Sequence, residues 1–231
     1  MKDSPEDQIV NAILDAIAEQ RLPAGTKLGE QALSDLFSCN RANVRRALAS
    51  LAAQQVVELR PNRGAFVMTP SPKEARDIFQ ARRAIERTIA RHASGQASAD
   101  DIAFLRDNIL EEAEARKAGD KPAELRASRQ FHMRIAQIAG NLVLERFLSE
   151  LTMRSTLILG LYSPTGSSSC AEDEHDRIVD ALEAGDTENL VQLADEHLRH
   201  LEAGLNFDEP PAAPMSLQEQ LMVPRRTPPA K

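Results

Sequence analysis

Aromatic residues are scarce in this 231-residue sequence, which contains no tryptophan, one tyrosine and seven phenylalanines. A hydrophobic core must therefore consist mainly of Leu, Ile, Val and Ala, which favours helices packed on helices. Apolar residues make up 42% of the chain and charged residues 27%, as in an ordinary globular protein. The length suits one large or two small domains.

Cysteine and long apolar runs are also rare. The two cysteines, Cys39 and Cys170, lie far apart, which excludes a disulfide framework and fits a reducing cytoplasm. No apolar run approaches the roughly 18 residues that a membrane-spanning helix needs. The first seven residues are polar and acidic, unlike a secretory signal. The sequence therefore predicts a cytoplasmic protein with no membrane partner.

Positive charge is unevenly distributed. The net charge is −7, but residues 1–68 carry eight basic and eight acidic residues, so the excess of acid lies in the rest of the chain. Within residues 40–63, five arginines accompany a single acid, Glu58. Because cellular salt screens charges beyond roughly 8 Å, a local basic surface can bind an anion even on an acidic protein.

The first third of the chain has the pattern of a winged helix-turn-helix, in which the third helix enters the major groove of DNA. Leu33, Leu36 and Phe37 are expected on the inner face of the second helix, and Asn40 is expected to cap the third. The spacing of apolar residues predicts helices over about residues 5–20, from residue 30 and over 41–54, and strands over 56–59 and 65–68.

The third predicted helix begins with side chains that can read bases. Arg41 and Arg45 are one turn apart and leave the same face, and arginine can bind guanine O6 and N7 together. A run of arginines is also common on solvated helices, so the helix order, the strands and the local charge together favour DNA binding. The predicted DNA-binding residues are Asn40, Arg41, Asn43, Arg45, Arg46, Arg60, Arg63 and Gly64.

Three stretches of this region resemble the GntR family of bacterial regulators: Leu22–Glu30 its opening motif, Ser38–Leu48 its recognition helix and Gly64–Val67 the end of its wing. The resemblance implies that Arg41 and Arg45 contact bases. The family usually reads Ser-Arg-Thr-Pro-Val-Arg-Glu where this chain reads Asn-Arg-Ala-Asn-Val-Arg-Arg, which leaves the operator sequence open.

The rest of the chain is predicted to be helical from Lys73 to about Phe207, with breaks that leave roughly six helices. The last segment contains six prolines and few apolar residues, which predicts disorder. The fold class is therefore mainly α, a winged helix-turn-helix with a small β-wing followed by an all-α bundle. The predicted domains are residues 1–70, residues 71–208 and a tail over 209–231.

Three histidines of the helical region lie where a metal could bind. His175 and His197 are 22 residues apart across a predicted helical hairpin, so they can face each other. Imidazole is the most common metal ligand among side chains. A single histidine on an apolar helix face, such as His132, is more often a hydrogen-bonded core residue. His92 and His200 are expected at the surface.

The helical region resembles the FCD ligand-binding domain of the FadR subfamily, most clearly at Arg82–Glu86, Phe131–His132, Ala139–Asn141, Glu174–Ile178 and Asp195–Leu198. The resemblance implies metal ligands at His132, His175 and His197, with Ser128 at the position of the usual Asp. Without that carboxylate, the site either binds a divalent metal through three histidines plus water or effector, or stays empty. Zinc is the first expectation, with nickel or manganese as alternatives.

The resemblance also implies an organic-acid effector, whose carboxylate would pair with an arginine. Arg82 is the first candidate, while for Arg134 and Arg154 a structural role is equally open. The prediction is then a homodimeric transcription regulator that binds a near-palindromic operator and releases repression when a metabolite binds.

Two other functions fit parts of the pattern. Three histidines with an open position are also the ligands of catalytic zinc sites. However, no general base is evident, because Glu172 and Glu174 are expected to point away from His175. A helical interaction protein without any ligand is the second alternative, and a collapsed, dry core would favour it.

Overall fold

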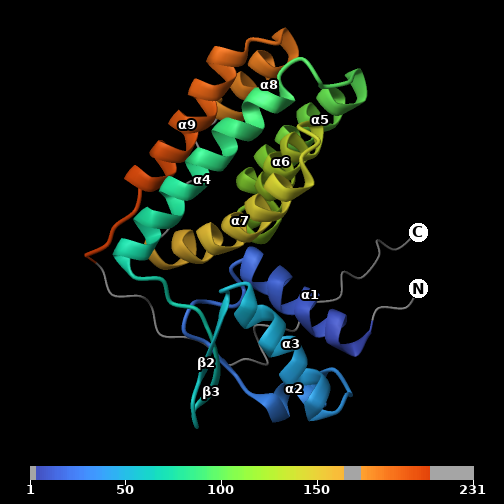
Figure 1. Ribbon diagram of the computed structural model, residues 1–231, viewed down its shortest axis with the longest axis vertical. Coiled ribbons are helices and arrows are strands. Elements are labelled where there is room, and N and C mark those ends of the chain that lie inside the picture. The colour runs from blue at the N-terminus through green and yellow to red at the C-terminus, as the bar shows by residue number, and fades with distance from the viewer. Residues whose placement is uncertain (1–3, 164–172, 209–231) are drawn as a thin grey trace. The chain divides into compact units, whose positions relative to one another are not determined.

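The computed structural model describes residues 4–163 and 173–208. The chain divides into two compact units that meet in sequence at Met68 and Thr69 (Figure 1). The tail predicted over 209–231 and Cys170 lie outside the described residues.

The first unit contains three helices and a small antiparallel sheet whose strand order is β1-β3-β2. The sequence predicts only two strands. The third, β1, was missed because two residues are too few to show an alternating pattern, and it pairs Leu28 with Ala65. The elements are α1 (Pro5–Ala18), β1 (Lys27–Leu28), α2 (Glu30–Leu36), α3 (Arg41–Ala53), β2 (Val57–Arg60) and β3 (Gly64–Val67).

Apolar residues of all three helices form the core of this unit. Helix α3 contributes Val44, Ala47, Leu48 and Leu51, which are all buried. The expectation that Leu36 lies on the inner face of α2 is wrong, because its side chain is 40% exposed. Helix α2 ends at this residue; Leu33 is buried as predicted, and Phe37, the C-cap, is half-buried.

The second unit is an all-helical bundle, and its six helices within the described residues agree with the predicted number. Helix α4 packs along α9, and α5 packs along α6 (Figure 1). The helices are α4 (Pro72–Ala93), α5 (Ala99–Lys117), α6 (Lys121–Ile138), α7 (Leu142–Tyr162), α8 (Glu174–Ala184) and α9 (Thr187–Ala203).

The ends of these helices follow from their capping residues. Ser71 and Ser98 each form a capping box with the acidic residue three positions later, Glu74 and Asp101. Helix α8 ends at Gly185, whose φ of +67° lies in the left-handed region that favours glycine. The helix ends at Ser71, Ser98 and Gly185 therefore coincide with chemical signals that start or stop a helix.

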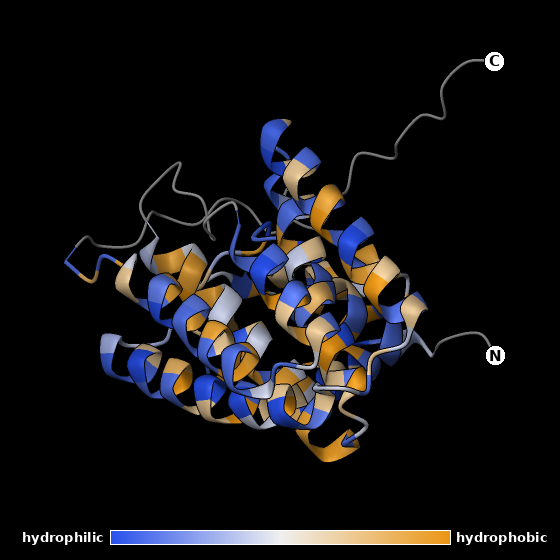
Figure 2. Cartoon of the chain, turned by 90° about the horizontal axis from the view of Figure 1, so that it is seen from above, coloured by the Kyte–Doolittle hydropathy of each residue, from blue (hydrophilic) through white to orange (hydrophobic). Residues whose placement is uncertain are grey.

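The bundle has a largely aliphatic core. Hydrophilic and hydrophobic residues both occur along the helices (Figure 2), as expected for helices that bury one face and expose another. Against this apolar background, a set of buried histidines and carboxylates stands out: Glu86, Glu112, His132, Glu174, His175 and His197. Among the described residues, no helix is long and apolar enough to cross a membrane.

Candidate nucleic-acid interface and metal centre

The start of α3 is built around Asn40. Its side-chain oxygen accepts a hydrogen bond from the backbone N–H of Asn43 at 2.9 Å, which caps the helix as predicted. The burial of Val44, Ala47 and Leu48 fixes the rotation of α3 and turns its other face to solvent. Asn40 therefore has a structural role in addition to any contact with DNA.

Three arginines extend from this outer face. Arg41, Arg45 and Arg46 are all exposed, and each donates to a polar partner of the same unit. The Nε of Arg45 lies 2.9 Å from Glu30, and that of Arg46 lies 2.9 Å from Glu6. Arg41 donates to Gln31, and Arg46 also donates to Asn43.

The hairpin between β2 and β3 carries the other predicted contacts. Arg60 forms an ion pair with Glu58 at 2.8 Å and lies over the ring of Phe66. Arg63 is exposed at the turn. Gly64 follows with a φ of +93°, a conformation that residues with a Cβ rarely adopt. The turn therefore places basic side chains next to the glycine backbone of Gly64, where no Cβ blocks the approach of a ligand.

The three predicted metal ligands come together in the helical unit. His132 belongs to α6, His175 to α8 and His197 to α9, and all three are buried. One ring nitrogen from each lies within 4.8 Å of the others. Phe131 stacks on His175 with ring centroids 4.1 Å apart, which holds that imidazole in place.

Each of these imidazoles is bonded to a buried carboxylate through Nδ1. The partners are Glu86 for His132 at 3.0 Å, Glu112 for His175 at 2.8 Å and Glu174 for His197 at 2.8 Å. Carboxylates in this position orient metal-binding histidines and make them stronger ligands.

Glu86 and Glu112 are functional residues that the sequence pattern does not predict. Glu174 was expected to point away from His175. It nevertheless belongs to the cluster, because it is bonded to His197. Its carboxylate bonds His197 and also His200, an exposed histidine as predicted. Glu172 lies outside the described residues.

The pKa values favour neutral histidines beside charged carboxylates. Burial lowers the pKa of His197 to about 3 and also lowers that of His132. Burial opposes the ionisation of Glu174, but hydrogen bonds from His197 and His200 outweigh it and lower the pKa to about 2. Metal binding requires this protonation state, because only a neutral imidazole has a lone pair to donate.

The donor set fits a divalent metal. Because Nδ1 of each histidine is bonded to a carboxylate, Nε2 remains as the ligand atom. The Nε2 of His197 is buried and has no hydrogen-bond partner among the described residues. A buried polar atom in that state is costly, and a metal ion would satisfy it. Ser128 lies one turn before His132 on α6 and is half-buried.

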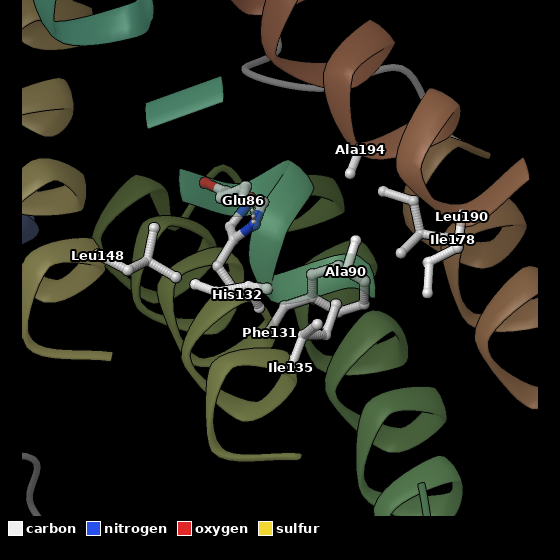
Figure 3. A pocket seen from close by; sticks show the side chains of 10 residues that line it. Glu86, Ala90, Phe131, His132, Ile135, Leu148, Ile178, Leu190 and Ala194 are labelled. Atoms are coloured by element: carbon white, nitrogen blue, oxygen red, sulfur yellow. Dashed lines mark hydrogen bonds and ion pairs between the residues drawn. The ribbon is translucent and has the colours of Figure 1, made fainter. Parts of the chain in front are cut away.

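A pocket lies beside His132. Figure 3 shows the Glu86 and His132 side chains bonded to each other among apolar side chains from the surrounding helices. Arg82, one turn before Glu86 on α4, is 4% exposed, and its Nε donates to Glu86 at 2.5 Å. Among the described residues, the structure shows no other acceptor for its guanidinium.

The other two candidate effector arginines have different surroundings. Arg134 forms an ion pair with Asp101 at 2.8 Å and lies over the ring of Phe104. Arg154 is half-buried in α7, where burial lowers its pKa and the charge of Glu74 opposes this. These contacts favour structural roles for both.

Comparisons with known proteins agree with this geometry. Residues 5–67 match the bacterial regulatory proteins of the gntR family, and residues 77–200 match the FCD domain. The fold resembles the solved structure of Escherichia coli McbR/YncC with a TM-score of 0.79 at 19% identity, covering 87% of this chain and 97% of that chain. The predicted fold class is therefore confirmed.

Curated relatives include the "Probable D-xylose utilization operon transcriptional repressor" of Paenarthrobacter nicotinovorans, which is 30% identical and covers 84% of this chain and 83% of its own. The transcriptional regulator LutR of Bacillus subtilis is 24% identical over 84% of this chain and 98% of its own. The family and these relatives are transcription regulators, not enzymes. The chain thus belongs to the GntR family of DNA-binding transcription regulators and carries an FCD domain after its winged helix-turn-helix.

Proposed function

We propose that the protein is a homodimeric repressor that binds a near-palindromic operator and is controlled by an organic acid and a divalent metal. The observation that carries the ligand part is the buried cluster of three histidines, each with its own carboxylate. The proposal includes a cytoplasmic location. Zinc is the first candidate metal, and nickel and manganese are the alternatives.

The exposed face of α3 supports the DNA-binding part of the proposal. Two recognition helices of a dimer would enter successive major grooves about one helical turn apart. Arg41 and Arg45 would read bases, while Arg46 and the wing residues Arg60 and Arg63 would hold phosphates. Asn43 and the Gly64 backbone would complete the surface.

The cluster supports the ligand part. The three Nε2 atoms would hold the metal and leave a coordination position for water or a carboxylate. When bound, the metal supplies a positive charge that attracts an organic acid. Arg82 would pair with the same acid, because its guanidinium is buried beside His132. The effector can change DNA affinity only to the extent that it binds the two conformations of the protein with different affinities.

A thermal-shift screen of the full chain with divalent metals, acetate, lactate, citrate and D-xylose tests this proposal. The sugar is included because one relative is named for D-xylose utilization. Zn²⁺ is expected to raise the melting temperature, and an active acid should then weaken operator binding in an anisotropy assay.

The matched variants are His197→Ala, inside the cluster, and His92→Ala, an exposed histidine of α4. Stabilisation by Zn²⁺ should disappear in the first variant and persist in the second. If both variants respond to the metal as the wild type does, the three-histidine site is not where it binds. If no metal or acid stabilises the wild type, the ligand part of the proposal is wrong.

A further inference from the structure

Among the three carboxylates of the cluster, Glu86 has a distinctive second partner. Its Oε2 bonds His132 at 3.0 Å, and its Oε1 accepts from Arg82 at 2.5 Å. Both side chains that it joins are at least 95% buried. One carboxylate thus connects a proposed metal ligand to the arginine proposed to hold the effector, and Glu86 and His132 both line the pocket in Figure 3.

We propose that Glu86 couples the two ligands of this site, so that a carboxylate bound at Arg82 strengthens metal binding at His132 and the metal strengthens carboxylate binding in return. This inference rests on the proposed function, because it takes the three histidines as metal ligands. Glu86 acts as a positioning residue, since it touches neither ligand.

The coupling follows from the sharing of one negative charge. While Arg82 binds Oε1, part of the charge of Glu86 is directed away from His132. An effector carboxylate that pairs with Arg82 takes over this role, and the charge of Glu86 then acts on the Nδ1–H of His132. An imidazole polarised in this way is a stronger metal ligand. Thermodynamic linkage requires that the metal improve effector binding by the same factor.

The other two carboxylates lack such a connection. Glu112 bonds His175 and Arg116, and Arg116 is held by Glu124 as well. Glu174 bonds His197, and its other oxygen bonds His200, which faces solvent. Both carboxylates can orient a histidine, but neither joins it to a buried arginine. Glu112 therefore provides a matched control for Glu86.

Calorimetric titration of the full chain with Zn²⁺, in saturating acetate or in sodium chloride of equal ionic strength, tests the coupling. Acetate should strengthen Zn²⁺ binding by about fivefold or more in the wild type. Glu86→Gln and Glu112→Gln should each weaken Zn²⁺ binding by about 10- to 100-fold, because both remove a carboxylate that orients a ligand. The factor by which acetate strengthens Zn²⁺ binding should fall to nearly one in Glu86→Gln and stay at the wild-type value in Glu112→Gln.

Glu86→Asp covers the case in which the Gln variant does not fold or no longer binds Zn²⁺. It keeps the charge but is one methylene shorter, so it can reach only one of its two partners. The acetate effect should therefore fall in this variant too, while its helical circular dichroism spectrum stays that of the wild type.

The outcomes separate this inference from the proposed function. If the wild type binds no Zn²⁺, the metal part of the proposed function fails, and the coupling fails with it. If the wild type binds Zn²⁺ but acetate has no effect on it, only the coupling is wrong. If the acetate effect persists in the Glu86 variants, acetate acts by binding the metal directly, and Glu86 does not carry the coupling.

Discussion

Single side chains with two partners account for much of the chemistry of this protein. Arg46 contacts Asn43 and Glu6, and Glu86 contacts His132 and Arg82. Removing one such residue leaves the other groups without the partner that satisfied them. At buried positions this costs more than the lost bond alone.

Arg45→Ala tests the recognition surface at the residue scale. An arginine that binds guanine through two hydrogen bonds contributes about 1–3 kcal/mol of discrimination, so operator affinity should fall about 5- to 150-fold. Fluorescence anisotropy with an operator duplex and a random duplex measures the change. Arg87→Ala, at an exposed arginine of α4, should leave affinity unchanged. If operator affinity is unchanged in Arg45→Ala as well, our assignment of the base-reading residues is wrong.

The histidines of the site were predictable from the sequence, but their carboxylate partners were not. His175 and His197 lie on consecutive helices, and the resemblance to the FCD domain added His132. Glu112 lies 63 residues before its partner His175. Sequence spacing reveals neighbours within a helix, but not which residues of separate helices meet. The one available signal was the position of Glu112 itself. It is a charged residue that shares a face of α5 with Leu105 and Ile109.

At the scale of elements, polar caps and glycines determine where the helices of the bundle begin and end. Serines start α4 and α5, and Gly185 ends α8. Such signals are local, which is why the sequence predicted these boundaries closely. Strand β1 depends instead on pairing with β3, from which it is separated by more than 30 residues, and a two-residue strand leaves no periodic pattern.

Ser71→Ala tests the capping box of α4. Loss of an N-cap costs about 1 kcal/mol, which corresponds to a fall of about 3 °C in melting temperature for a unit of this size. Hydrogen bonds from the Ser71 backbone and side chain lower the pKa of Glu74 below 4.5. The stability from this pairing is therefore present above pH 4.5 and is lost as the pH falls through the lowered pKa.

The difference between Ser71→Ala and the wild type should accordingly shrink between pH 7 and pH 3.5, as measured by thermal unfolding followed by circular dichroism. Glu74→Gln, which has no carboxylate to titrate, should weaken this pH dependence. An equal difference in melting temperature at both pH values would show that Glu74 contributes nothing to the cap.

At the scale of the whole molecule, the two units have separate cores and different net charges. The net charge of −7 lies in residues 69–231, while residues 1–68 have no net charge and carry five of their six arginines on α3 and the wing. The acidic part cannot attract DNA, so binding depends on the local surface of the first unit. The proposed metal site lies entirely within the second unit.

Differential scanning calorimetry of the full chain should therefore resolve two transitions, because each unit has its own core. Zn²⁺ at about 100 times its dissociation constant stabilises the unit that binds it by about 2.7 kcal/mol. Only one transition should shift, upward by roughly 5–10 °C. Removing the metal with a chelator should reverse the shift. A single transition that moves as a whole with Zn²⁺ would show that the units unfold together.

The ion pairs of the recognition helix have a consequence for how the protein searches DNA. Glu30 and Glu6 act as built-in counterions for Arg45 and Arg46, so a docking duplex must displace acids of the same chain rather than dissolved anions. At a random sequence, a phosphate would offer Arg45 little more than the carboxylate that it gives up. At the operator, the edge of a guanine offers two directed hydrogen bonds. If Arg45 reads a base as proposed, its ion pair with Glu30 would therefore lower affinity for random DNA more than affinity for the operator.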